Sequence, residues 1–219
     1  MEKAREITIK GIGNLTAKPD FVIISIGLEK VNQNYSEGYK SFAQDMKKLQ
    51  ETVEEVGFSK DELKASSISS SQHQEYEKGK YVSKGYRFAA SLNLSFDFDP
   101  ERLGKALEKV SKSEVKPSIS IRFTVKDKEE IKNQLLAAAA QDAKKKAEIL
   151  CTALGVKLGQ LLKINYNWEE IDIYSRMDYK MEMEECCIGS APGDDDTIDF
   201  TPEDIDLTDD ASFVWEIEG

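Results

Sequence analysis

The chain has few of the residues from which catalytic and metal sites are most often built. Its single histidine, His73, lies in a serine-rich stretch with no second histidine or cysteine nearby, whereas transition-metal sites usually need several such ligands. We therefore expect His73 to face solvent. No other segment suggests the nucleophile of a His-based triad. The sequence predicts no catalytic residues, no metal site and no cofactor, and so a protein that is not an enzyme.

Cysteine is also scarce. The three cysteines are an odd number, which argues against a disulfide framework and favours a reducing compartment. Cys151 falls in an apolar helical pattern and is expected to be an inert core residue. Cys186 and Cys187 are adjacent in an acidic segment, whose negative charge disfavours the reactive thiolate.

Long apolar runs are absent. No stretch approaches the eighteen apolar residues of a membrane span, so none is predicted. Charges at Glu2, Lys3, Arg5 and Glu6 exclude a signal peptide within residues 1–12. As written, the chain is expected to be soluble and cytoplasmic. A protein trimmed of an export signal would read identically, and its location would then be periplasmic or exported.

Charge is unevenly distributed along the 219 residues. Residues 167–219 hold 18 acidic residues against Arg176 and Lys180, a net charge of −16, whereas residues 1–166 have a net charge of +5, which together give −11. An acidic tail of this kind is usually a solvating segment, and it opposes binding to nucleic acid or anionic membranes. We expect no nucleic-acid partner.

The strongest positive signal is alternation. From Tyr86 to Phe98 every even position is apolar and every odd position except Ala89 is polar. This period of two predicts a β-strand with one dry and one wet face. Residues 119–126 repeat the pattern. A sheet that is wetted on one face must carry its helices on the other, which predicts an α+β two-layer sandwich with a mostly antiparallel sheet.

Helix-capping residues, the spacing of apolar residues and turn residues predict the remaining helices and strands. Lys78–Lys80 predicts the turn of a long hairpin that projects beyond the domain body. Helix starts are expected at Asn34 or Ser36 and at Asp99 before Pro100, and helix ends are expected at Gly57 and Gly155. Strands are expected at 5–12, 21–31, 63–77, 86–98, 117–126, 162–168 and 213–217, and helices at about 36–56, from 100 onward and at 128–154.

The helix at 128–154 carries a stripe of apolar and small residues. The run Ala137–Ala140 predicts close approach to a sheet or to another helix. The stripe is expected to comprise Ile131, Leu135, Ala139, Ala143, Ala147, Leu150 and Leu154.

We interpret residues 1–219 as a single domain with an acidic, partly disordered insertion at about 169–211. Residues 189–196 have the composition of a disordered segment. A short amphipathic helix is expected at the start of the insertion, on a face formed by Ile171, Tyr174, Met177 and Met181.

Several segments together resemble one known family. These segments are Ile9–Gly13 followed by Lys18–Asp20, Gly85-Tyr86 before the long strand, the alanine-rich helix end at Ala137–Leu158, and Thr201–Ile205 before the last strand. The pattern is similar to that of the SIMPL-domain family and covers residues 6–168 and 200–218. Glu203 stands where the family more often has glycine.

The resemblance implies little about chemistry. Family members are mostly bacterial proteins of unknown function, often exported or periplasmic, and some are described as oxidative-stress-defence proteins or surface antigens. At least some assemble into large rings or channel-like oligomers, and none supplies a catalytic motif. This chain departs from the family in its acidic, cysteine-containing insertion and in the lack of the usual export signal.

Three further motifs have ordinary structural interpretations. Gly11-x-Gly13 lacks the third small residue and the following helix of a dinucleotide site, so a turn or bulge is expected there. The acidic run Asp194–Asp199 fails the spacing of an EF-hand and is expected to be a solvated loop. A cluster of lysines is expected to form a solvated helix face, and comprises Lys126, Lys128, Lys144, Lys145 and Lys146.

Three functional hypotheses remain, of which the third is an enzyme whose type no motif in the sequence identifies. The first is a non-enzymatic, self-associating protein, because a projecting hairpin at 64–98 offers an edge or a face to symmetric partners. The second is a ligand- or cation-binding module, which would use the acidic insertion or a polar sheet face formed by Arg87, Asn93, Arg122 and Thr124.

Overall fold

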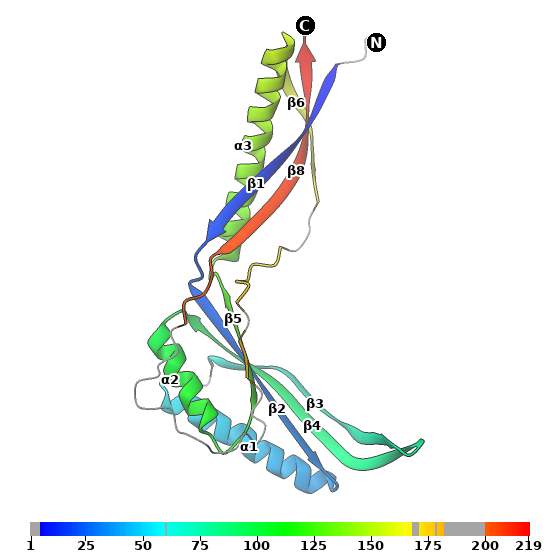
Figure 1. Cartoon of the computed structure of the whole chain (residues 1–219), viewed down its shortest axis with the longest axis vertical. Helices are drawn as coiled ribbons and strands as arrows, with labels where there is room; N and C mark the ends of the chain where they lie inside the picture. Colours follow the sequence, from blue (N-terminus) through cyan, green and yellow to red (C-terminus); the bar gives the residue numbers. More distant parts are fainter. Residues whose placement is uncertain (1–4, 60, 168–170, 178, 182–199) are drawn as a thin grey trace. The chain divides into compact units, whose positions relative to one another are not determined.

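A computed structural model describes residues 5–59, 61–167, 171–177, 179–181 and 200–219 (Figure 1). This part of the chain has three helices and two antiparallel sheets, which confirms the α+β class. The chain divides into two compact units. We call them the α3 unit (residues 1–19, 125–174 and 203–219) and the hairpin unit (residues 20–124 and 175–202).

The α3 unit is one long helix on a three-stranded sheet. α3 (Lys128–Leu154) lies along one face of the sheet, whose strand order is β1–β8–β6 (Figure 1). The strands are β1 (Glu6–Ala17), β8 (Ile205–Glu218) and β6 (Lys157–Tyr166). Odd-numbered residues of β1 and β8 point toward the helix and bury Ile9, Phe213 and Trp215.

The bounds predicted for α3 are confirmed. The helix begins after Asp127, whose side chain accepts the N–H of Glu130 at 2.9 Å, and it ends at Gly155, which has a left-handed φ of 71°. The predicted stripe is partly wrong, because Leu150 and Leu154 are exposed and Cys151 is buried. The buried residues recur every fourth position from Leu135 to Cys151. Since a helical turn takes 3.6 residues, a row of residues spaced by four winds slowly around the helix. In the last turns the buried row therefore passes through Cys151, and Leu150 and Leu154 lie beside it in solvent.

Gly11 and Gly13 do not form the expected turn or bulge, and β1 does not stop at Ile12. Both glycines lie inside β1, directly beneath α3. A Cβ atom on Gly11 would lie 2.0 Å from the carbonyl oxygen of Ala139, and one on Gly13 would lie 2.1 Å from that of Leu135. The glycines therefore let the strand and helix backbones approach each other, which confirms the close approach predicted from the alanine run.

The hairpin unit is a five-stranded sheet with two helices on one face. The strand order is β3–β4–β2–β5–β7. Asn34, one of the two predicted candidates, caps α1, and Asp99 caps α2 as predicted; both side chains accept helix N–H groups. The elements are β2 (Phe21–Asn32), α1 (Tyr35–Glu55), β3 (Leu63–Glu77), β4 (Lys80–Asp97), α2 (Pro100–Ser111), β5 (Ser118–Thr124) and β7 (Tyr179–Met181).

The alternation that defined the long strand is confirmed. Phe88, Leu92 and Phe96 are buried on the helix side of β4, while Arg87 and Asp97 are exposed on the other side. Partners in the register share these faces, so Val22, Ile24 and Ile26 of β2 join the same core. Burial of this face provides the main driving force for folding of the unit.

Three further strand boundaries differ from the sequence prediction, and the first is that β4 begins at Lys80 instead of Tyr86. β6 begins at Lys157, directly after α3, and β8 begins at Ile205 instead of Phe213. Residues 171–177 are not helical, and β7 follows them, so the amphipathic helix predicted there is wrong. The predicted insertion therefore contains β7 and the start of β8. Its segment at 189–196 lies outside the described residues.

Candidate functional site

In the described part of the hairpin unit, the β3–β4 hairpin is packed mainly at its base. Its base is anchored where Tyr86 and Phe88 of β4 contact Tyr35 of α1, with ring centroids 5.2 Å and 5.3 Å apart. From Lys64 to Glu77 every residue of β3 except His73 is exposed. Figure 1 shows the end of the β3–β4 ribbon lying apart from α1 and β2, and the predicted projection of the hairpin is thus observed within its unit.

The turn and the bend of the hairpin depend on backbone geometry. Lys78 and Gly79 have φ values of 48° and 81°, which a two-residue hairpin turn requires. Gly85 has a φ of 107°, and a Cβ atom there would lie 2.3 Å from the carbonyl oxygen of Asn32. The local sequence therefore fixes both the tip of the ribbon and the point where it leaves the body of the sheet.

Large apolar and aromatic side chains are exposed on the ribbon. Ile68 is 66% exposed, Tyr76 is 67% exposed and Tyr81 is 74% exposed. Tyr76 lies opposite Tyr81 in the register, and their rings meet edge to face with centroids 5.2 Å apart. Sequence reasoning missed this pair, although the Lys78-Gly79 turn signal fixes the register that brings the two rings together.

A small ionic network lies on the ribbon. Lys84 lies 2.5 Å from a carboxylate oxygen of Glu77 and 3.5 Å from one of Glu75. The hydrogen bond with Glu77 is the main cause that raises the pKa of Lys84. His73 is half-buried, not fully solvent-facing as expected, and its Nε2 lies 3.4 Å from Glu75. These exposed pairs orient side chains and contribute little stability.

The polar sheet face predicted as a ligand surface is only partly assembled. Arg87 pairs with Glu29, and Ser25 donates a hydrogen bond to Asn93 at 2.9 Å. Arg122 is exposed on this face, but Thr124 is 1% exposed, so its placement in a wet surface was wrong. The strand alternation ends at Phe123, and Thr124 and Val125 are both buried where β5 ends.

A shallow, open cavity lies in the α3 unit. It has a volume of about 250 Å³ and is lined by Asn14, Thr16, Asp206, Thr208 and the flanking Leu15 and Leu207. Thr16 donates to Asp206 at 2.8 Å, and Thr208 donates to Asn14 at 2.9 Å. These two cross-strand pairs leave amide and carboxylate groups at the cavity wall that a small polar ligand could contact.

The other candidates lie apart from one another. Lys144 and Lys145 are exposed on α3, as expected, whereas Lys146 donates to Asp142 at 2.6 Å. Cys151 is a buried free thiol, as expected. Within the described ranges no group of three or more His, Cys, Asp or Glu side chains has the arrangement of a metal site. Asp194, Asp195, Asp196, Asp199, Cys186 and Cys187 lie outside the described residues.

Comparison with known proteins identifies the family. The model of the SIMPL family, described as a protein of unknown function (DUF541), matches residues 7–215. The chain belongs to the SIMPL family. The match spans segments of both compact units, and it confirms the resemblance seen in the sequence. No curated protein matches the chain. In the described parts of this SIMPL protein, no helix is long and apolar enough to cross a membrane.

Proposed function

We propose that this SIMPL protein is a non-enzymatic protein that associates with copies of itself through the β3–β4 hairpin. The supporting observation is a two-stranded ribbon that exposes Ile68, Tyr76 and Tyr81 to solvent. An isolated two-stranded ribbon is at best marginally stable in water, and exposed apolar side chains gathered on one element are typical of protein interfaces. A partner that covers the ribbon would supply the burial that it lacks.

The composition of the ribbon also fits protein recognition. Tyrosine provides a large contact area for a small loss of side-chain freedom, and serine provides adaptable hydrogen bonds. The stretch Ser66–Ser71 combines five serines with Ile68, and the tip adds Tyr76 and Tyr81. A catalytic role would require converging polar groups in a pocket, and the groups on this ribbon instead project from an exposed surface.

Light scattering coupled to size-exclusion chromatography tests the proposal. At micromolar concentration the protein should elute as a particle of at least twice the 24.7 kDa chain mass. Replacing Ile68, Tyr76 and Tyr81 with serine should shift the particle toward the chain mass. A matched control replaces the exposed α3 residues Ile149 and Leu154 with serine, which should leave the mass unchanged. A wild-type monomer would refute the proposal.

A second candidate is a module that binds a small polar ligand or a cation. The observation in its favour is the cavity at Asn14 and Asp206 in the α3 unit. Thermal shift against calcium, magnesium and a panel of polyols tests this function. A ligand should raise the melting temperature of the wild type but not that of Asp206→Ala. An absence of any shift would remove the support for this candidate.

The cellular setting belongs to the same proposal. Three cysteines, one of them a buried free thiol at Cys151, favour a reducing compartment such as the cytoplasm. Oxidative-stress defence, the description given to some relatives by resemblance, is the role we propose to examine first. Growth of a deletion strain under peroxide tests it, and unchanged sensitivity would contradict it.

A further inference from the structure

The strands at the edges of the two sheets differ in how they are protected. An open edge presents unpaired N–H and C=O groups to any extended chain, so edges are usually blocked. At β1, α3 provides the block. Ile12 donates its N–H to Oδ2 of Asp142 at 2.8 Å, and Nζ of Lys146 donates to the carbonyl of Lys10 at 3.4 Å. Side chains of the helix therefore occupy the edge of β1.

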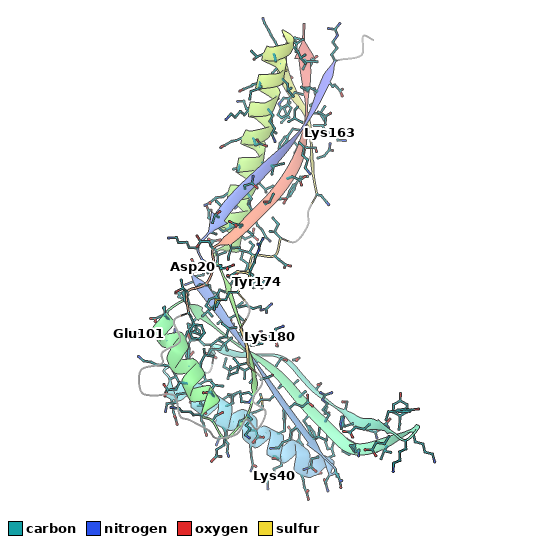
Figure 2. The ribbon with its side chains drawn as sticks, viewed as in Figure 1. Asp20, Lys40, Glu101, Lys163, Tyr174 and Lys180 are labelled. Atoms are coloured by element: carbon teal, nitrogen blue, oxygen red, sulfur yellow. The ribbon has the colours of Figure 1, made fainter. Side chains whose placement is uncertain are left out.

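β6 and β7 are protected in other ways. The pairing of β6 with β8 shifts register twice, between Leu158 and Leu161 and between Leu161 and Lys163. β6 also carries Lys157 and Lys163, and Figure 2 labels Lys163 on this strand. β7 has only three residues. Bulges, lysines and short length are all known devices against unwanted strand pairing.

β3 has none of these devices along its centre. Its register shifts lie between Ala65 and Ser67 and between His73 and Gln74, so residues 67–73 form a regular stretch. The stretch reads SISSSQH and contains no proline and no carboxylate, lysine or arginine. Among the described residues no strand pairs with its outer edge. This edge is both long and open, in contrast to the other three.

We infer that the outer edge of β3 pairs antiparallel with β3 of a second copy, about a twofold axis within Ser69–Ser71. This inference rests on the proposed self-association and names its geometry. Lys64 lies at one end of β3 and Glu75 and Glu77 lie at the other. Antiparallel pairing therefore brings Lys64 of one copy to the acidic end of the other, whereas parallel pairing would place Glu75 beside Glu75 and Lys64 beside Lys64.

The faces of β3 agree with this arrangement. Ser69 and Ser71 share the face of Ala89 and Arg87, and Ser70 shares the opposite face with Phe88. A twofold axis perpendicular to the sheet keeps each face continuous between the copies, because both strands then alternate in step. The residues at the axis are serines, which are small and uncharged. Lys84 contacts Glu75 from the β4 side, so Lys64 of the second copy approaches from the open side.

Single cysteines on β3 test the pairing in the full chain, with Cys186 and Cys187 replaced by serine. Ser69→Cys, Ser70→Cys and Ser71→Cys should form disulfide-linked dimers under mild oxidation, fastest for the residue nearest the axis. Lys64→Cys should not link to itself, because antiparallel copies of residue 64 would lie roughly 40 Å apart at about 3.3 Å per residue. Mixed with Glu75→Cys or Glu77→Cys, it should link to that partner.

A charge variant gives an independent measurement. Ser69→Lys with Ser71→Lys places like charges across the axis and should raise the dissociation constant at least tenfold, with an unchanged circular-dichroism spectrum. Asn133→Lys with Gln141→Lys adds the same charge on exposed α3 positions and should leave the constant unchanged. Particle mass measured on the same samples distinguishes a failure of the self-association from a failure of the strand pairing alone. A monomeric wild type refutes the self-association itself.

An oligomer without β3 cross-links overturns only the strand pairing, and the proposed self-association then stands on other surfaces. Self-linking of Lys64→Cys would show parallel pairing and would overturn the inference in the same way. Equal cross-linking of Ser70→Cys and of the exposed α3 control Lys145→Cys would indicate random collision, and it would also contradict the pairing.

Discussion

Both units pack helices against an antiparallel sheet, but the edges and faces of the two sheets are covered differently. In the α3 unit, Gly11 and Gly13 allow the backbone of α3 to contact the backbone of β1 directly, and the side chains of Asp142 and Lys146 occupy the edge of β1. In the hairpin unit, β3 and β4 continue past Tyr86 with neither face covered by a helix of that unit. The sheet of the α3 unit is protected by its own helix, whereas the β3–β4 ribbon of the other sheet presents an edge and both faces to solvent. We propose that the first kind of contact maintains the fold and that the second would mediate the proposed association.

The largest expected effect is in the close contact of the α3 unit. Gly11→Ala places a Cβ atom 2.0 Å from the carbonyl oxygen of Ala139, so the helix must move away from the strand. We expect a loss of roughly 3 kcal/mol or more in the free energy of unfolding, measured by urea denaturation followed by circular dichroism. Gly104→Ala is the control, because its Cβ enters open space in α2 and should stabilise by about 0.5–1 kcal/mol. Equal effects of the two variants would contradict the contact.

A smaller effect is expected at a helix start of the hairpin unit. The Asp99 side chain accepts the N–H groups of Glu101 and Arg102 at 2.9 Å and 3.1 Å. Asp99→Ala removes this cap and should lower the free energy of unfolding by about 1 kcal/mol, while Asp99→Asn should retain most of it. A loss as large as that of Gly11→Ala would mean that the units do not differ in the way we describe.

A still smaller effect is expected in the pH dependence of the unfolding free energy, at Glu62 of the hairpin unit. The Ser59 N–H donates to Glu62 at 2.8 Å, and this bond is the main cause that lowers the pKa of the Glu62 carboxyl below 4.5, with Arg102 adding to it. Because the folded-state pKa is lowered, the contribution is present above pH 4.5 and is lost as the pH falls through the folded value. Glu62→Gln should therefore lose less stability than wild type between pH 5 and pH 3, by under about 1 kcal/mol. Parallel pH curves of the two proteins would contradict this cause.

The smallest effect on folding is expected at the hairpin tip. Tyr76→Ser with Tyr81→Ser removes two exposed rings, so a variant kept monomeric by dilution should lose under about 0.5 kcal/mol of unfolding free energy. The same variant should associate more weakly than wild type in light scattering. A loss above about 2 kcal/mol would place the tip in a folded core and break the distinction between the two regions.

Much of this architecture could be predicted from local signals. Alternation placed Phe88 and Leu92 inward, and capping residues predicted the starts of α1 and α2 and the end of α3. The sequence did not predict that β1, β6 and β8 form a sheet of their own, because pairing of strands far apart in the chain leaves no local signal. Gly11 and Gly13 look like strand breakers unless the helix above them is known. The Tyr76–Tyr81 pair could have been predicted from the sequence, since the turn residues determine the register of the hairpin.

Hydrogen exchange at several protein concentrations tests the central claim most directly. If the open edge of β3 is completed by a second copy, the amides of residues 67–73 should become more protected as the concentration rises through the association range. The Ile12 amide, already bound by Asp142, should exchange at one rate throughout. Exchange at β3 that is fast and independent of concentration, in a protein shown to be oligomeric, would contradict the account.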